Sequence, residues 1–243
     1  MNPKPVPTIP AGMPTSTMRT SHGELALARL LQLVSPSLPI GGYTYSQGIE
    51  WAVEAQWISN QDDLQQWLAG VMQTNLCYLE LPILKRMLEA WSGSDLAQLE
   101  HWNEVLIASR ETAELRLEEA NRARAFYGVI SSLEPAAVEY QPILRQSHIA
   151  GYSFACERWQ IDFERAACGW LWSWLENLVL CGVKIIPLGQ TAGQQTIFSL
   201  GEMVPGIVGV AEALADEEIG ASSMAQAIAS ARHETQYTRL FRS

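Results

Sequence analysis

Apolar and polar positions alternate along this chain mostly with the period of an α-helix. The first clear apolar stripe consists of Leu25, Leu27, Leu30, Leu31 and Val34, and it stops at Pro36. A proline disfavours helical dihedral angles in the residue before it, so a helix is expected to end there. Runs that alternate between β-branched and polar residues are nearly absent, so no sheet has an obvious source. The pattern predicts an all-α fold.

The same spacing predicts a series of helices separated by short breaks. They are expected over residues 23–34, 49–57, 64–91, 99–127, 142–158, 163–181, 190–200 and 222–241. Pro82 is expected to kink or divide the third helix, and Ser59 followed by Asp62 resembles a capping arrangement ahead of it. In the fourth helix, Glu118 and Arg122 are spaced for an ion pair on the outer face, worth only about 0.2–0.5 kcal/mol.

The N-terminal region has a different composition. Prolines occur there at Pro3, Pro5, Pro7, Pro10 and Pro14. No helix or central strand tolerates this density of proline, so a disordered Pro-rich tail is expected at residues 1–22. The remainder contains no internal repeat and no linker, and we therefore expect a single all-α domain, a helical bundle, over residues 23–243.

The composition narrows the class of protein. Of the 243 residues 48% are hydrophobic, and 16 Lys and Arg stand against 26 Asp and Glu, a formal net charge of −10. Affinity for nucleic acids and anionic membranes comes from clustered cations, so neither is expected as a partner. The four cysteines are Cys77, Cys156, Cys168 and Cys181, and they form no CxxC pair. They are expected to be buried free thiols in a reducing cytoplasm.

Neither a signal peptide nor a membrane span is expected. Prolines occupy the N-terminal positions where a signal peptide needs an apolar region. The most apolar stretch, AACGWLWSWLENLVLCGVKIIPLG, is broken by Glu176, Asn177 and Lys184 before it reaches ~18 uninterrupted apolar residues. We therefore expect a cytoplasmic protein.

Catalytic motifs are not found. The stretch SPSLPIGGYTYSQGIE at residues 35–50 has the glycines of a phosphate-binding loop but no lysine and no preceding strand. Ser46 lacks the leading glycine of a nucleophile elbow, and it could instead cap the helix that begins near Gly48. His233 beside Glu234 would bind a divalent metal only weakly, or across a dimer interface. Composition and spacing alone predict no enzyme.

Two features suggest contacts with other chains. Lys184 interrupts an apolar run, so it either extends outward from the helix end or meets a carboxylate of this chain or of a partner. The C-terminal stretch ASARHETQYTRLFRS gathers Arg232, Arg239 and Arg242 with Tyr237 and Phe241. Arginine and aromatic residues are enriched at protein interfaces, although a solvated helix end would have a similar composition.

Four stretches resemble the UreF family of urease accessory proteins. They are SPSLPIGGYTYSQGIEWAVE at 35–54, SRETAELRLEEANR at 109–122, GVKIIPLGQ at 182–190 and IASARHETQYTRLFRS at 228–243. The resemblance implies an all-α, homodimeric, cytoplasmic chaperone that is not itself an enzyme. It would join the UreD or UreH scaffold protein, recruit the GTPase UreG, and dock on apo-urease for GTP-dependent nickel insertion. No cofactor would be bound stably, and the complex as a whole would handle nickel.

The resemblance also implies where partners bind. The rigid loop is expected to project Tyr43, Gln47 and Glu50 together, with Glu50 and Lys184 on the side of the GTPase. The C-terminal stretch is expected to become ordered on the scaffold protein, as a helix. The expected partner-binding residues are Tyr43, Ser46, Gln47, Glu50, Lys184, Arg232, His233, Tyr237, Arg239, Phe241 and Arg242, with His233 also a candidate for transient nickel contact.

Two alternatives remain from the sequence. One is a helical-bundle enzyme in which Ser46 or Lys184 acts on a small molecule. The other is a helical scaffold unrelated to urease.

Overall fold

The computed structural model describes the backbone of residues 15–243 and the side chains of residues 23–243. This part of the chain is helical and contains no strand, which confirms the predicted all-α class. The α-helices are α1 (Thr15–Leu33), α2 (Ile49–Glu54), α3 (Gln61–Val71), α4 (Leu81–Gly93), α5 (Leu96–Ala108), α6 (Ala113–Leu133), α7 (Gln141–Leu144), α8 (His148–Arg158), α9 (Phe163–Ile185), α10 (Gln190–Gly201), α11 (Val204–Ala213) and α12 (Met224–His233). Short 3-10 helices are η1 (Gly42–Thr44), η3 (Pro135–Val138) and η4 (Asp216–Glu218).

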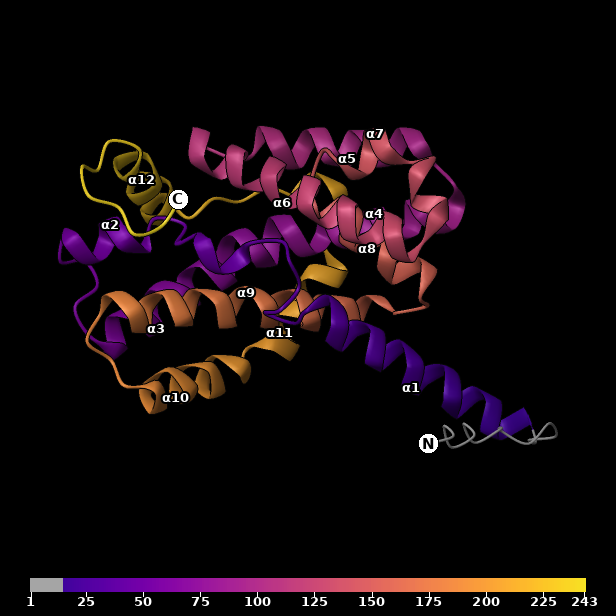
Figure 1. Ribbon diagram of the computed structural model, residues 1–243, viewed down its shortest axis with the longest axis horizontal. Coiled ribbons are helices and arrows are strands. Elements are labelled where there is room, and N and C mark those ends of the chain that lie inside the picture. Colours follow the sequence, from indigo (N-terminus) through magenta and orange to yellow (C-terminus); the bar gives the residue numbers. More distant parts are fainter. Residues whose placement is uncertain (1–14) are drawn as a thin grey trace, which may run out of the picture.

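Helix α9 runs through the middle of the molecule (Figure 1). Helices α10 and α3 pack against it, while α4, α5, α6 and α8 pack on one another. Buried apolar side chains from α1 to Phe241 form one hydrophobic cluster, which ties the ends of the described chain to the same core. Helix α1 extends away from the body, and the C-terminal end lies beside α2 and α12.

A disordered tail was predicted over residues 1–22. Of these, residues 1–14 lie outside the part of the chain that the structure describes. Helix α1 already begins at Thr15, ahead of Gly23 where the apolar pattern starts. Among the described residues no single helix is long and apolar enough to cross a membrane, and α10 with α11 meets that test only as a pair bent by 40°. Three of the four cysteines are buried, as expected, whereas Cys168 is exposed, and all four are free.

The helix predicted over residues 99–127 is wrong as a single element. The chain breaks between Ala108 and Ala113, and the Thr112 hydroxyl caps α6 by accepting from Leu115 N at 3.1 Å. The helix predicted over residues 142–158 is divided in the same way, because the Ser147 hydroxyl accepts from Ala150 N at 3.1 Å and starts α8. Where the apolar positions keep their helical spacing across such a break, the polar N-cap residue does not stand out in the sequence and the break is missed.

Between α3 and α4 the chain is π-helical over Met72–Glu80, named η2. Pro82 follows in the first turn of α4, where a missing N–H costs little. The division expected at Pro82 therefore occurs, with the π-helical segment ahead of it. The cap at the start of α3 is Asn60 and not Ser59: Asn60 Oδ1 accepts from Asp63 N at 3.0 Å. Segment η2 carries Asn75 and Glu80 into the interior, and π-helical turns are frequent at functional sites.

Helix α12 ends at His233, so the helix predicted over residues 222–241 is too long. The remaining residues form an irregular segment that returns to the molecule. Helix α11 was not predicted from the sequence, because its residues VPGIVGVAEA combine glycine and β-branched residues with low helix propensity.

Candidate functional site

Residues 238–243, here called the C-terminal segment, fold back onto the loop between α1 and α2. The main-chain oxygen of Ser243 accepts from Ser46 N at 2.5 Å and from Gln47 N at 3.0 Å. The Ser46 hydroxyl donates to the same oxygen at 2.5 Å. Arg242 N donates to Thr44 O at 2.9 Å. Main-chain groups of the loop therefore hold the last two residues of the segment.

Glu50, in the first turn of α2, holds the middle of the same segment. Its two carboxylate oxygens accept from Leu240 N at 2.6 Å and from Phe241 N at 2.9 Å. The carboxylate is buried, so these two bonds replace the water that it would otherwise bind. Because Glu50 faces the segment and not the solvent, its carboxylate becomes accessible only after the segment moves.

His233 lies between two carboxylates and has no solvent exposure. Its Nε2 is 3.2 Å from Glu50 Oε2, and its Nδ1 is 2.7 Å from Glu114 Oε2. Ionised carboxylates can only accept, so this arrangement needs either two N–H donors on the ring or one proton on a carboxyl group. Arg239 Nη1 donates to the second oxygen of Glu114 at 2.7 Å and completes the chain of contacts.

The neighbour expected for His233 has another role. Glu234 caps α6, where its carboxylate accepts from Ala113 N at 2.7 Å and Glu114 N at 3.2 Å. No group of three or more His, Cys, Asp or Glu suited to a metal ion occurs in the part of the chain that the structure describes. The carboxylates beside His233 sit on opposite ring nitrogens, so they cannot converge with one nitrogen on a single ion.

The loop does not project Tyr43, Gln47 and Glu50 together, and this expectation is wrong. Tyr43 is 55% exposed, whereas the Gln47 side chain points inward, accepting from Trp174 Nε1 at 3.0 Å. The turn at Gln47 and Gly48 is left-handed, with φ of 52° and 87°. A Cβ at Gly48 would lie 2.8 Å from Ser230 N, so the position requires glycine both for its angle and for its space.

Lys184 lies in the last turn of α9 and is exposed, in agreement with the first of the two readings of this residue. Its Nζ is 5.9 Å from the centroid of the Phe241 ring. None of the ion pairs formed within residues 23–243 includes it. Its charge is therefore available next to the C-terminal segment.

The outer side of the C-terminal region combines cations with apolar groups. Tyr237 is completely exposed and Leu240 is 68% exposed. Arg232 and Arg242 are also exposed. In a chain with a net charge of −10, this end of the molecule exposes several cations and aromatic groups, and we call the exposed residues together the C-terminal face. It consists of Tyr43, Lys184, Arg232, Tyr237, Arg239, Leu240 and Arg242.

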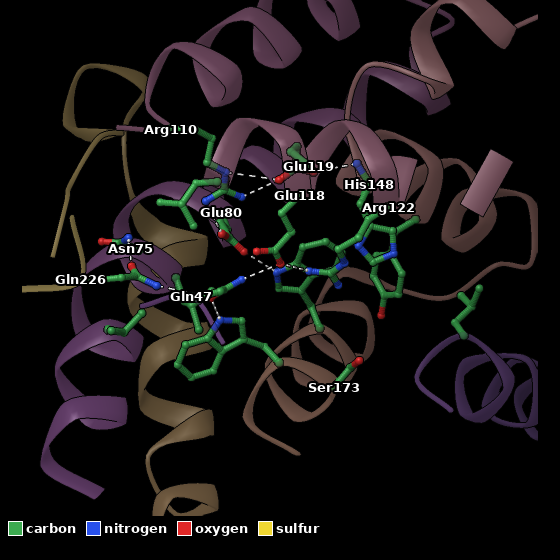
Figure 2. Close-up of a pocket in the computed structure, with 17 residues that line it drawn as sticks. Gln47, Asn75, Glu80, Arg110, Glu118, Glu119, Arg122, His148, Ser173 and Gln226 are labelled. Atoms are coloured by element: carbon green, nitrogen blue, oxygen red, sulfur yellow. Dashed lines mark hydrogen bonds and ion pairs between the residues drawn. The ribbon is translucent and has the colours of Figure 1, made fainter. Parts of the chain in front are cut away.

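A small cavity of about 30 Å³ lies beneath the loop, lined mainly by polar side chains (Figure 2). The labelled lining residues are Gln47, Asn75, Glu80, Arg110, Glu118, Glu119, Arg122, His148, Ser173 and Gln226. One water needs roughly 10–15 Å³ measured in this way, so the cavity has room for about two or three waters. Both ring nitrogens of His148 and Nε of Arg122 lack a protein partner and are the groups that such waters would bind.

Arg110 joins two buried carboxylates in this cavity. Its guanidinium is 2.7 Å from Glu80 Oε1 and 2.8 Å from Glu119 Oε2. Burial lowers the pKa of Arg110, but the two carboxylates outweigh it and raise the pKa above its usual value. Glu119 also accepts from His148 N at 2.7 Å, while burial and nearby Arg122 lower the pKa of His148. The charges therefore connect η2, the turn before α6 and α8.

The ion pair of Glu118 with Arg122, expected on an outer face, is buried against this cavity instead. Burial raises the pKa of Glu118, and Arg122 at 3.2 Å and a hydrogen bond from Gln47 at 2.9 Å oppose that rise. Leu117, an apolar residue that the helical spacing within 99–127 predicts to face the core, is 56% exposed instead. The helix is thus turned so that its carboxylates face inward.

Sequence reasoning missed the groups that connect these features, namely Glu80, Arg110, Glu114, Glu119 and His148. Four of them are charged side chains on predicted helices, which are normally solvated, and His148 has no His, Cys or carboxylate placed as in a known metal motif. The only available signal was the stretch at 109–122, which contains three of them.

Taken together, the fold and the site define an all-helical protein whose charged groups hold chain segments together and present a basic, aromatic face. A model of the UreF family matches residues 58–201. The urease accessory protein UreF of Alcanivorax borkumensis is 48% identical over 225 residues, covering 90% of this chain and 98% of that protein. The urease accessory protein UreF of Pseudomonas putida strain W619 is 44% identical over 223 residues, covering 91% and 100%. The chain belongs to the UreF family.

Proposed function

We propose that this protein is a urease accessory protein that works as an adaptor and catalyses no reaction of its own. In this proposal it bridges the UreD or UreH scaffold protein and the GTPase UreG, and it supports GTP-dependent insertion of nickel into apo-urease. The single observation that carries the adaptor role is the C-terminal face, where exposed cations and aromatic groups gather in an otherwise acidic protein.

The GTPase side of the proposal includes Lys184, Tyr43 and Glu50. The ammonium of Lys184 is exposed and would pair with a carboxylate of UreG. Glu50 is buried against the C-terminal segment, so it would act by holding that segment, or directly once the segment is displaced. Ser46, Gln47 and His233 support the same region from inside.

The scaffold side includes Arg232, Tyr237, Arg239, Phe241 and Arg242. Tyr237 is fully exposed, and exposed aromatic and arginine side chains supply most of the binding energy in many interfaces. Phe241 is buried in the free chain, so it would reach the partner only when the segment leaves the body of the protein. Tyr237, Arg239 and Phe241 would then become ordered on the partner.

The remaining parts of the proposal concern nickel and assembly. We propose no stably bound cofactor, and nickel would contact this chain at most transiently, at His233. We also propose a homodimer that works in the cytoplasm. Calorimetry with nickel, comparing the protein with His233→Ala, tests the metal contact, and the mass of the purified protein in solution tests the dimer.

The enzyme alternative has little support from the site. The hydroxyl of Ser46 is buried and donates a hydrogen bond to the main-chain oxygen of Ser243, so it is not placed as a nucleophile. Lys184 is exposed at a helix end rather than enclosed in an apolar pocket of the kind that activates a lysine nucleophile.

Reconstitution tests the function directly. Apo-urease, the scaffold protein, UreG, GTP and nickel are combined with and without this protein, and urease activity is measured. We expect activation only when all parts are present, and restored urease activity in cells that lack their own accessory gene. Activation that is equal without this chain, or an unaided reaction catalysed by the purified chain, would exclude the proposal.

A further inference from the structure

The C-terminal segment is bound as a peptide ligand is bound, through its main chain. Leu240 N and Phe241 N donate to Glu50, and Arg242 N donates to Thr44 O. The oxygen of Ser243 accepts from two loop N–H groups. The main-chain donors and acceptors of these consecutive residues thus form hydrogen bonds with the body of the protein and not within a helix or strand of the segment itself. Recognition of extended peptides commonly relies on such main-chain bonds.

Side chains supply two further anchors. The Phe241 ring is 7% exposed and belongs to the hydrophobic core, and Arg239 pairs with Glu114. By contrast, Tyr237 and Thr238, which precede the anchored residues, are exposed. The anchored residues are therefore separated from α12 by a short exposed connection, which is the arrangement of a ligand on a tether.

The receptor side is held in place by contacts of its own. The left-handed turn at Gln47 and Gly48 is fixed by the bond from Trp174 to Gln47. Glu50 and Glu114 are both held by His233. Removal of the segment would leave these two carboxylates facing an open groove beside an emptied apolar site, an environment that favours a ligand with a cation and an aromatic group.

We propose that this groove, formed by Thr44–Gln47, Glu50 and Glu114, is a peptide-binding site whose built-in ligand is the C-terminal segment. It accepts in trans an extended peptide with an arginine, and an aromatic residue two positions further on, as in Arg239 and Phe241. The short tether raises the effective concentration of the built-in ligand to about the millimolar range, so the groove is closed to other peptides until the segment leaves.

The groove also regulates the C-terminal face, and this consequence rests on the proposed function. A partner that draws out Tyr237 and Arg239 competes with Glu50 and Glu114 for the segment. Binding of that partner then opens the groove and so raises the affinity for a peptide. By reciprocity, a peptide bound in the groove raises the affinity for the partner by the same factor. The site itself does not depend on what the partner is.

The first test uses residue-resolved hydrogen exchange on the unmodified full chain. We expect the amides of Leu240, Phe241 and Arg242 to exchange at least about tenfold more slowly than those of Tyr237 and Thr238, because only the former are hydrogen-bonded. Equal exchange along the whole stretch would show an empty groove and overturn the proposal.

The second test uses a full-length Phe241→Ala chain, in which the segment has lost its apolar anchor. A fluorescent, end-capped peptide of residues 238–243 is titrated into this variant and into the unmodified chain, with anisotropy as the readout. We expect at least about tenfold tighter binding to the variant, because its groove is vacated. A peptide of the same composition in scrambled order is the ligand control, and Phe241→Ala combined with Glu50→Gln is the groove control; both should bind weakly.

Equal binding to the two chains, equal binding of the scrambled peptide, or no binding to a folded variant overturns the proposal. If Phe241→Ala loses its helical circular dichroism, a protease site is placed between Tyr237 and Thr238 of the unmodified sequence and cut after folding. Retention of the cleaved segment on the protein, and its release by excess peptide, are then expected; immediate loss of the segment contradicts the proposal. These measurements need no partner, so their failure and a failure of urease activation are distinguishable.

Discussion

The Ser243 hydroxyl donates to Glu118 Oε2 at 3.1 Å, and this bond joins the C-terminal segment to a carboxylate that lines the buried cavity. Glu118 also accepts from Gln47, whose main-chain N–H holds Ser243 from the other side. Three parts of the chain that are far apart in the sequence therefore meet at one carboxylate. The C-terminal face and the polar interior are consequently parts of one connected structure.

Glu118 should make the stability depend on pH in a specific direction. Its pKa is raised above the ordinary value of 4.5, mainly by burial, so the folded protein binds this proton more tightly than the unfolded chain. Glu118 therefore contributes its full stabilisation below pH 4.5, the ordinary value. This contribution falls as the pH rises from 4.5 through the raised pKa. Glu118→Gln should therefore gain stability relative to the unmodified protein with rising pH across this window, measured by urea unfolding. A difference that does not change with pH would contradict this assignment.

Arg110 should be among the most sensitive positions of the interior. Arg110→Ala leaves Glu80 and Glu119 buried without their shared cation, and an uncompensated buried charge typically costs about 3–5 kcal/mol. The free energy of unfolding in urea measures the loss. The matched control is Arg110→Met combined with Glu80→Gln and Glu119→Gln, which removes all three charges and should recover most of the stability. Equal losses in both proteins would show that the charges are not the cause.

Gly48→Ala should destabilise the loop that receives the C-terminal segment. The left-handed angle of 87° costs roughly 1–2 kcal/mol for a residue with a Cβ, and the close approach to Ser230 adds to this. The control is Gly70→Ala in α3, where a Cβ would meet nothing within 4 Å. That change should stabilise by about 0.5–1 kcal/mol, because glycine disfavours a helix interior. Thermal unfolding distinguishes the two, and shifts in the same direction would contradict the prediction.

Lys184→Ala should weaken recruitment of UreG without unfolding the protein. Truncation of one member of a desolvated charge pair typically costs about 2–5 kcal/mol of binding. Pull-down of UreG and urease activation are the readouts, and unchanged circular dichroism is required. The control is Lys85→Ala, since Lys85 forms an i,i+4 pair with Glu89 on α4. Normal recruitment by Lys184→Ala would remove this residue from the GTPase side.

Removal of residues 238–243 should abolish binding of the scaffold protein while the helical circular dichroism persists. The deleted residues lie beyond α12, so no helix is shortened. Co-purification with the scaffold protein is the measurement. The control is Arg165→Ala, which changes an exposed cation at the start of α9, paired only with Asp162 of the preceding cap, and should bind normally. Retained binding after the deletion would assign the scaffold contact to another face.

Much of the fold could be predicted from local pattern. The end of α1 near Pro36, the course of α9 and the start of α10 follow from apolar periodicity and from proline and glycine positions, which act over one or two turns. The break before α6 was missed because Leu106 and Ala113 are seven residues apart, and this step keeps the apolar stripe in phase across the gap.

By itself the sequence determined that this chain is all-helical, where most of its helices lie, and that a glycine-rich loop and an arginine-rich end are its distinctive stretches. Only the tertiary structure decided that Glu118 faces inward while Leu117 faces solvent, and that His233 lies between Glu50 and Glu114 rather than beside Glu234. The physical reason is the separation along the sequence over which each kind of interaction acts. Periodicity and capping are set by residues within about four positions, whereas Glu50 and His233 are 183 positions apart and meet only because α2, α6 and α12 pack together.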